Sequence, residues 1–218
     1  MAETIAVLQR KGGVGKSTLI CSFAYHLSHQ GARVLVIDTD RQGTCTRYHD
    51  LAKTSEFNIV TAFDDARFRA VLERYGPEHD VVLIDTPGVE SRLTSYVAAA
   101  SDLVLIPASP SLPDAEGAGS TWELVERVRE ANNGRPKKAL VVMSKFVPTA
   151  RVTASIAKSM RSAGLPLYPW GMQELTGFRE MFSTGVPVGV SHRASLHLLT
   201  HLQIDGYISW EARTHEVA

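Results

Sequence analysis

The sequence predicts an α/β fold, with a doubly wound, mostly parallel β-sheet flanked by helices. Short runs of Val, Ile and Leu, such as residues 33–38 and 80–85, recur along the chain, and longer amphipathic stretches separate them. Continuous apolar strands are typical of a sheet covered on both faces, and their alternation with helices favours parallel strands. No internal repeat or linker interrupts the sequence, so we expect a single domain over residues 1–218.

The individual elements follow from periodicity and from the residues that can end them. Apolar residues at helical spacing predict a helix over residues 17–29, and Gly31 is suited to end it. Pro107 is expected to end the strand that begins at residue 102, because proline cannot donate a backbone hydrogen bond. The predicted strands are residues 4–8, 33–38, 57–61, 80–85, 102–107 and 138–143. The predicted helices are residues 17–29, 44–51, 65–75, 91–100, 114–132, 152–163, 174–183 and 194–210.

The composition excludes little by itself. The 23 basic and 23 acidic residues balance, so the whole chain demands neither nucleic acid nor a membrane as its partner. The charge is nevertheless uneven, since acidic residues outnumber basic ones over residues 64–116 and the reverse holds over residues 151–193. This asymmetry is consistent with an anionic partner for the C-terminal third, and equally with scattered, solvated side chains.

Cysteine usage and hydropathy favour a cytoplasmic protein. Cys21 and Cys45 lie in no spacing typical of a metal site, and Cys21 falls within an apolar helical run that is typical of a small core residue. The N-terminus lacks a signal-peptide pattern, and no apolar run approaches the ~20 residues that a membrane-spanning helix needs.

The segment GGVGKST lies between the first predicted strand and the first predicted helix, which is the context of a phosphate-binding loop. Its residues are Gly12, Gly13, Val14, Gly15, Lys16, Ser17 and Thr18. Glycines allow backbone N–H groups to converge on phosphate oxygens, and the positive end of the helix dipole points at the same anion. Lys16 would supply a cation to the outer phosphates, and the Ser17 hydroxyl would be a ligand of Mg²⁺.

Carboxylates at the carboxyl ends of strands extend this site. Asp85 ends one buried strand, and Asp38 and Asp40 end another, so all three are expected near the same crevice. Asp80 and Asp102 begin strands instead, so we expect them at the opposite edge of the sheet as solvated side chains.

Three motifs, KGGVGKST, VIDTDRQG and VLIDTPG, together resemble the deviant-Walker ATPases of the ParA/MinD superfamily. The resemblance implies ATP/ADP and Mg²⁺ as cofactors, and an ATPase activity that is weak without a partner. It also implies that Lys11 is the signature lysine that reaches across a homodimer interface to the partner's nucleotide. Lys16 and Ser17 would be the loop lysine and the Mg²⁺ ligand. Asp40 would be the switch I aspartate needed for hydrolysis, Asp38 a contact of the Mg²⁺ water shell, and Asp85 the Walker B residue.

Two further features bear on the resemblance. Arg41 stands where the family commonly has proline, so the switch is freer and carries a cation near the phosphates. The segment after the strand at residues 138–143 matches the region where the family recognises the base. Lys145 and Pro148 are therefore expected on the base side of the nucleotide. The Pro-containing segment over residues 106–119 resembles one that lies near the adenosine and the subunit interface.

Within the superfamily, the chain resembles most the small ParA-like plasmid partition ATPases that lack an N-terminal helix-turn-helix. The first strand is expected at about residue 4, which leaves no such extension. Neither cysteine matches the pair that would hold an iron–sulfur cluster. Residues 199–218 carry one Arg and no Lys, unlike the basic amphipathic helix of the membrane-bound branch. Tyr207 and Trp210 are expected to pack in the core with the last helix.

The resemblance implies an ATP-dependent dimer that binds DNA without sequence preference through basic residues on C-terminal helices. The candidates form a predicted basic patch of Arg151, Lys158, Arg161, Arg179 and Arg193. A ParB-like or other cargo-adaptor protein would stimulate hydrolysis, and the cargo would be a plasmid or chromosome. Such a protein would be cytoplasmic and nucleoid-associated in a bacterium or archaeon, and no membrane partner is expected.

Three alternatives remain open at this point. The cargo could be a carboxysome or a chemoreceptor cluster, because cargo choice resides in the adaptor. A MinD-like, membrane-associated division regulator would bind lipid in place of DNA. A metabolic enzyme with the same loop, such as a small kinase or a dethiobiotin-synthetase-like ligase, would turn over a small acceptor.

Overall fold

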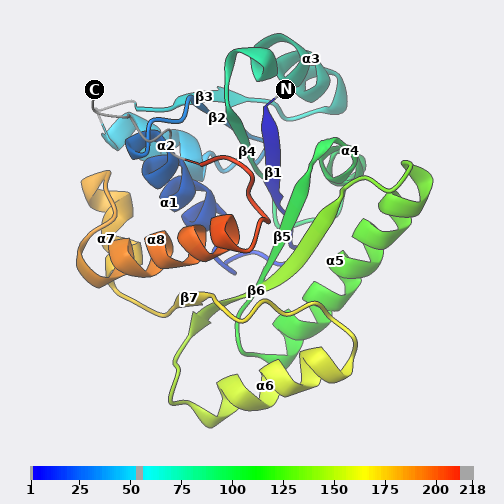
Figure 1. Ribbon diagram of the computed structural model, residues 1–218, viewed down its shortest axis with the longest axis vertical. Coiled ribbons are helices and arrows are strands. Elements are labelled where there is room, and N and C mark those ends of the chain that lie inside the picture. Colours follow the sequence, from blue (N-terminus) through cyan, green and yellow to red (C-terminus); the bar gives the residue numbers. More distant parts are fainter. Residues whose placement is uncertain (1, 53–55, 212–218) are drawn as a thin grey trace.

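A seven-stranded β-sheet forms the centre of the computed structural model, which describes residues 2–52 and 56–211. The strands follow the order β3-β2-β4-β1-β5-β6-β7, and every neighbouring pair is parallel (Figure 1). They are β1 (Glu3–Val7), β2 (Val34–Asp38), β3 (Asn58–Thr61), β4 (Val81–Asp85), β5 (Leu103–Ala108), β6 (Lys138–Phe146) and β7 (Met172–Gln173). The sheet extends from β1 in both directions, which confirms the doubly wound fold that the sequence predicts.

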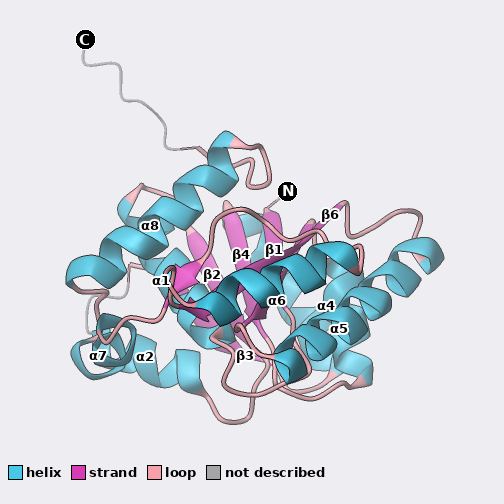
Figure 2. Cartoon of the chain, turned by 90° about the horizontal axis from the view of Figure 1, so that it is seen from below, coloured by secondary structure: helices cyan, strands magenta, loops and turns pink. Residues whose placement is uncertain are grey.

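Helices cover both faces of this sheet, as Figures 1 and 2 show from two directions. One layer contains α1 (Lys16–His29), α2 (Thr44–Ala52), α7 (Gly177–Thr184) and α8 (Gly189–Ile204). The other contains α3 (Asp65–Tyr75), α4 (Arg92–Ala100), α5 (Leu112–Ala131) and α6 (Arg151–Ser162). A short 3₁₀ helix, η1 (Gly76–Glu78), follows α3. Within the described ranges, no helix combines the length and the apolar character needed to cross a bilayer.

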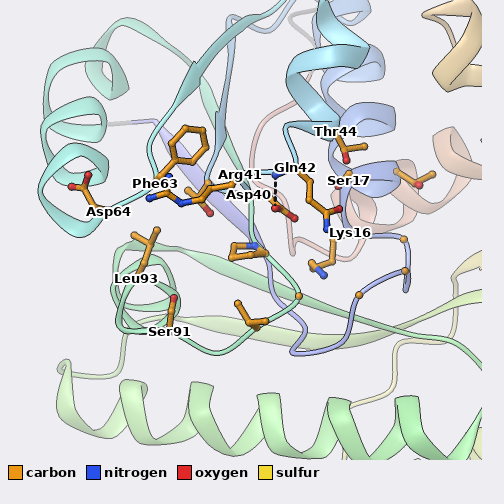
Figure 3. Close-up of a pocket in the computed structure, with 18 of the residues that line it drawn as sticks. Lys16, Ser17, Asp40, Arg41, Gln42, Thr44, Phe63, Asp64, Ser91 and Leu93 are labelled. Atoms are coloured by element: carbon orange, nitrogen blue, oxygen red, sulfur yellow. Dashed lines mark hydrogen bonds between the residues drawn. The ribbon is translucent and has the colours of Figure 1, made fainter.

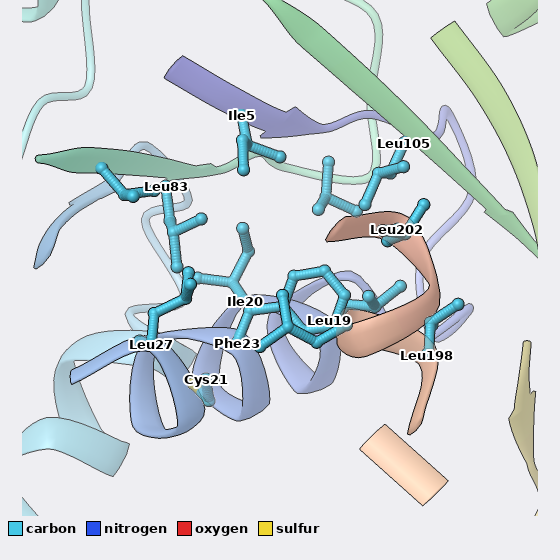
Figure 4. Packing of buried hydrophobic residues seen from close by; sticks show 14 of the residues in the cluster. Ile5, Leu19, Ile20, Cys21, Phe23, Leu27, Leu83, Leu105, Leu198 and Leu202 are labelled. Atoms are coloured by element: carbon cyan, nitrogen blue, oxygen red, sulfur yellow. The ribbon is translucent and has the colours of Figure 1, made fainter. Parts of the chain in front are cut away.

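The two layers produce two hydrophobic cores, because successive side chains of a strand point to opposite faces. Ile5 and Val7 of β1 contribute to the core beneath α1, whereas Ala6 contributes to the core beneath α3, α4 and α5. Figure 4 shows the first core, where Leu19, Ile20, Phe23 and Leu27 of α1 face strand residues and the leucines of α8 lie beside them. This double coverage explains why the strands are apolar without alternation.

Pro107 does not end its strand, in contrast to the prediction. β5 continues to Ala108, which pairs with Met143 of β6. The neighbouring β1 pairs with β5 only as far as Leu105. The Pro107 carbonyl oxygen accepts a hydrogen bond on that side from Nε2 of Gln9, at 3.2 Å. The missing N–H of proline therefore faces a position beyond the end of β1, and the sheet loses no ladder hydrogen bond there.

The edge of the sheet beyond β5 is longer than predicted. β6 runs to Phe146, with an irregularity between Ser144 and Phe146 where Lys145 adopts a left-handed φ of 50°. β7 pairs with β6 across this bulge. A two-residue strand is too short for periodicity to reveal, and it falls just before the segment that was predicted as helix 174–183, whereas α7 begins at Gly177.

The last helix was also displaced in the prediction. It was expected over residues 194–210, but α8 spans Gly189–Ile204. Tyr207 and Trp210 therefore lie beyond the helix, and they pack against the α1-side core from the segment that follows it, so their expected core role holds. Residues 212–218, the end of the tail on which the membrane alternative depends, lie outside the described residues.

Candidate nucleotide-binding site

The glycine-rich loop connects β1 to α1 in the middle of the sheet. Gly13 and Gly15 have φ values of 77° and 94°, which L-residues with a side chain rarely adopt. Gly15 immediately precedes α1, so the helix points its N-terminus at the loop. A cavity of about 1050 Å³ opens here, lined by the loop, by the segment after β2 and by residues of α3 and α4 (Figure 3). It lies outside the carboxyl ends of the strands, where ligands bind in such sheets.

Lys16 lies at the base of this loop and is buried, with a relative exposure of 7%. Its Nζ donates a hydrogen bond to the carbonyl oxygen of Lys11 at 3.1 Å. Burial lowers the pKa of Lys16, and the nearby carboxylates of Asp85 and Asp40 oppose that effect. A buried ammonium group is costly without a strong partner, so an anion in the loop would be bound favourably.

Ser17 and Asp85 form the second part of the site. The Ser17 hydroxyl donates to Oδ2 of Asp85 at 2.7 Å. Burial raises the pKa of Asp85 to about 6, while the hydrogen bonds from Ser17 and Cys45 oppose the rise. Oδ1 of Asp85 is buried and has no hydrogen-bond partner among the described residues. A hydroxyl beside a buried, partly unpaired carboxylate is a donor set that fits a hard cation such as Mg²⁺.

Asp38, for which the resemblance implies a contact with the Mg²⁺ water shell, holds the segment that follows β2 in this structure. Its Oδ2 accepts hydrogen bonds from the backbone N and the hydroxyl of Thr46, at 3.1 and 2.9 Å, and its Oδ1 accepts one from the backbone N of Asp40. The carboxylate is fully buried and does not line the cavity. Asp38 therefore fixes the segment after β2 to the first turn of α2, and a Mg²⁺ contact stays a prediction.

Asp40 and Arg41 follow Asp38 and line the cavity. Oδ1 of Asp40 accepts a hydrogen bond from the backbone N of Gln42 at 2.9 Å, which holds the turn that carries it (Figure 3). The Arg41 guanidinium lies 5.3 Å from the centroid of the Phe63 ring. In Figure 3 this ring lies on the side of the cavity away from Lys16. The Arg41 guanidinium, which the sequence predicts near the phosphates, is therefore held beside the Phe63 ring in this structure.

Lys11 forms an ion pair with Asp114 of its own chain, in the first turn of α5. Asp114 is buried, and it also accepts a hydrogen bond from the Ser109 hydroxyl. About half of the Lys11 side chain remains exposed, and Lys11 does not line the cavity. Sequence reasoning missed Asp114. The only signal was its position in the Pro-containing segment over residues 106–119.

A second cavity of about 320 Å³ lies between β6, β7 and α7, next to the same loop. Lys145 lines it, and its Nζ donates to the carbonyl oxygen of Gly13. The contact of Lys145 with a base stays a prediction. Pro148 is exposed and lines neither cavity. Phe182 of α7 lines both cavities, and its ring lies 5.7 Å from that of Tyr48 of α2. The sequence singled out Arg179 only for the basic patch, and it missed the following lining residues: Met172, Gln173, Glu174, Leu175, Phe178 and Phe182.

The predicted basic patch divides into two groups. Arg151, Lys158 and Arg161 are exposed on α6, which confirms that they occupy one helix. Arg179 on α7 pairs with Glu174 at 3.3 Å, and Arg193 is exposed on α8. Because α6 belongs to one helical layer and α7 and α8 to the other, the five cations do not share one helical face.

The fold and the site together define a class of protein. A strand, a glycine-rich loop and a helix that begins with lysine and serine, beside an aspartate at the end of the neighbouring strand, make this a P-loop nucleotide-binding protein. The chain belongs to the CobQ/CobB/MinD/ParA nucleotide binding domain family, whose model matches residues 5–188. The ParA/MinD resemblance of the three motifs is therefore confirmed.

Individual relatives agree with this assignment. The maintenance of carboxysome distribution protein A of Halothiobacillus neapolitanus is 28% identical over 191 residues, which cover 86% of this chain and 87% of that protein. Protein ParA of Rhizobium radiobacter is 28% identical over 187 residues, which cover 83% and 82%. The chain thus falls among ParA-like positioning and partition ATPases.

Solved structures share the fold. An ATP complex of a McdA variant from Cyanothece matches with a TM-score of 0.78 at 18% identity, over 97% of this chain and 99% of that one. MinD of Aquifex aeolicus matches with a TM-score of 0.75, also at 18% identity, over 93% and 97%. At this identity the likeness establishes the fold alone.

Gly88, which follows β4 in the VLIDTPG motif, lies close to the backbone of the loop. A Cβ atom there would lie 2.7 Å from the backbone N of Gly12 and 2.9 Å from its Cα. Gly88→Ala must therefore displace the loop, and we expect it to weaken ATP affinity about tenfold. A titration with a fluorescent ATP analogue measures the change. Gly119→Ala is the matched control, because a Cβ there meets nothing within 4 Å, and equal affinities for the two variants would contradict the prediction.

Proposed function

We propose that this chain is an ATP-dependent dimerising switch that binds DNA without sequence preference and positions a cargo, with an adaptor protein stimulating hydrolysis. The observation that carries the proposal is the presence of two lysines with different environments in one loop. Lys16 is buried beneath its own loop, where it would hold the phosphates of the same subunit. Lys11 is half-exposed and does not line the cavity of its own loop; it pairs with Asp114 of α5, and exchange of that ion pair would make it available to the nucleotide of a second subunit.

Hydrolysis would depend on positioning and on charge stabilisation. The loop N–H groups and Lys16 bind the outer phosphates, and Ser17 and Asp85 are the residues that would hold Mg²⁺. When bound, this ion neutralises charge that develops on the phosphate oxygens. Asp40, on a turn that borders the cavity, orients the attacking water. A cation supplied by a second subunit would act as an arginine finger does in trans, which makes dimerisation depend on ATP.

Replacing Lys11 by glutamine tests the switch. We expect Lys11→Gln to retain ATP affinity within about threefold, because Lys16 and the loop amides remain, but to lose ATP-dependent dimerisation and stimulated hydrolysis. Light scattering with size-exclusion chromatography, with and without ATP and Mg²⁺, measures the oligomeric state. Lys137→Gln is the control, since Lys137 is also exposed but lies at the opposite edge of the sheet. A Lys11→Gln protein that dimerises like the wild type with ATP would refute the proposal.

DNA binding is assigned to α6 first, because its three cations are exposed together. We expect simultaneous replacement of Arg151, Lys158 and Arg161 by alanine to weaken binding of the ATP-bound protein to duplex DNA by at least about tenfold, and to reduce the salt dependence of the affinity. Dimerisation should be unchanged. Fluorescence anisotropy across a salt series measures both properties.

The control for the α6 variant removes the same charge elsewhere. Arg67, Arg127 and Lys137 are exposed cations outside the predicted patch, and their triple alanine variant should bind DNA like the wild type. Equal losses in the two triple variants would show that net charge alone governs binding, and an unaffected α6 variant would place the DNA contact outside α6.

The cargo is a second question, and a carboxysome or another protein body is the alternative to a plasmid or chromosome. The relative named for carboxysome distribution and the relative named ParA have the same identity to this chain, so identity does not separate them. A neighbouring gene for a small DNA-binding adaptor would support partition, and a compartment gene cluster would support a protein cargo. ATP-dependent sedimentation with liposomes but not with DNA would favour a division regulator instead.

A further inference from the structure

The two cysteines of the chain lie against one another beside the candidate site. Cys21 is on α1 and Cys45 is in the first turn of α2, and their sulfur atoms are 3.5 Å apart. These are the only cysteines in the sequence. Both are buried, with 1% relative exposure. Sequence reasoning treated Cys21 as a core residue and did not connect it with Cys45, because the pair forms only when two helices pack.

Cys45 also contacts the residues assigned to the cation. Its S–H group donates to Oδ2 of Asp85 at 3.2 Å, the same oxygen that accepts the hydroxyl of Ser17. The sulfur of Cys21 in turn lies against the sulfur of Cys45 on the side of α1. The thiol pair therefore contacts the Ser17–Asp85 pair through the sulfur atom of Cys45. Any change in its covalent state alters the hydrogen bonding of Asp85.

We propose that Cys21 and Cys45 form a redox-modification site, a reversible disulfide that holds the nucleotide switch inactive. The reaction is an exchange with a low-molecular-weight disulfide. The two protein thiols lose two protons and two electrons and form one S–S bond, while the S–S bond of the reagent breaks and yields two reagent thiols. The inactivating consequence rests on the proposed nucleotide switch, but formation of the bond does not.

The consequence follows from where the bond would fall. The two bonded sulfur atoms are about 2.05 Å apart, so they must approach one another from 3.5 Å, and Cys45 loses the thiol hydrogen that it donates to Asp85. The bond would tie the helix of the phosphate loop to the helix that follows the switch segment Asp40–Gly43. That segment would then be enclosed between two covalently joined helices, and it could not rearrange around a nucleotide.

Access to the pair is coupled to the same segment. Both thiols are buried, and burial raises the pKa of each, which slows their attack on a disulfide in the closed structure. A reagent reaches them when the first turn of α2 separates from α1. Asp38 holds that turn through Thr46, so movement of the switch and exposure of the thiols are one event.

Oxidation of the intact chain by oxidised glutathione tests the proposal. Intact-mass spectrometry should show the loss of two hydrogens, and thiol titration of the unfolded product should fall from two groups to none. The oxidised protein should bind a fluorescent ATP analogue at least about tenfold more weakly than the reduced protein, and dithiothreitol should restore the affinity. Cys21→Ser is the matched control: it cannot form the internal bond, so its nucleotide affinity should not respond to the oxidant.

Several results would overturn the proposal. These are mixed disulfides with glutathione without an internal bond, an oxidised protein that binds nucleotide like the reduced one, or a Cys21→Ser protein that is inactivated equally. Cys21→Ala provides a second control if the serine variant does not fold, as judged by circular dichroism. Failure of the reduced wild type to bind ATP would instead refute the proposed function, and the mass measurement would still decide whether the disulfide forms.

Discussion

Replacing Lys16 by alanine will abolish useful nucleotide binding, with a loss of about 100-fold or more in affinity for ATP. The ammonium group is buried at the base of the loop, and the backbone carbonyl of Lys11 is its only hydrogen-bond acceptor among the described residues. A phosphate would satisfy the donors that remain, and such charge-assisted contacts contribute about 3 kcal/mol when they are desolvated. Isothermal titration calorimetry with ATP and Mg²⁺ measures the change directly.

The free energy of unfolding separates this effect from misfolding. Removing a buried cation that has few partners should leave the unliganded protein as stable as the wild type or slightly more stable. Lys137→Ala removes an exposed lysine at the opposite edge of the sheet and should retain full affinity. ATP binding by Lys16→Ala within a few fold of the wild type would remove Lys16 from its assigned role.

Replacing Asp40 by alanine will reduce the rate of ATP hydrolysis by about 100-fold and accumulate the ATP-bound dimer. The carboxylate borders the cavity and is held on its turn by the backbone N of Gln42. In the proposed function this carboxylate orients the attacking water and contacts no phosphate, so its loss should slow hydrolysis without weakening ATP binding. A phosphate-release assay measures the rate, and light scattering in the presence of ATP measures the dimer.

The control for Asp40 is a nearby carboxylate that faces solvent. Asp50 is exposed on α2, and Asp50→Ala should hydrolyse ATP like the wild type. An Asp40→Ala protein that stays monomeric with saturating ATP would show that Asp40 is needed to form the dimer. The assignment of Asp40 to hydrolysis alone would then be wrong.

The sequence predicted the loop well, because all of its information is local. A run of glycines followed by Lys16 and Ser17 dictates a turn and a helix start whatever surrounds them, and the apolar strands identify a doubly covered sheet. Boundaries failed where backbone chemistry depends on a neighbour. Pro107 continues its strand because β1 has already ended beside it, and no property of residues 102–107 indicates that.

The contacts that the sequence missed join distant segments. Asp114 meets Lys11, Phe63 meets Arg41, and Cys21 meets Cys45 only after the sheet has assembled. Composition singled out basic residues in the C-terminal third. It could not assign them to layers, since a helix's side of the sheet is set by the connections between strands. α6 therefore lies apart from α7 and α8 despite its proximity in sequence.

Phe182 has a thermodynamic consequence for nucleotide choice. Its side chain lines both the larger cavity at the glycine-rich loop and the smaller cavity beside Lys145. Its ring also packs against the ring of Tyr48 of α2. Where this ring couples binding in the smaller cavity to binding in the larger one, each ligand group changes the affinity for the other by the same factor, because linkage is reciprocal. If the proposed function holds and the base lies beside Lys145, a nucleotide altered only in its base should therefore also bind the larger cavity differently.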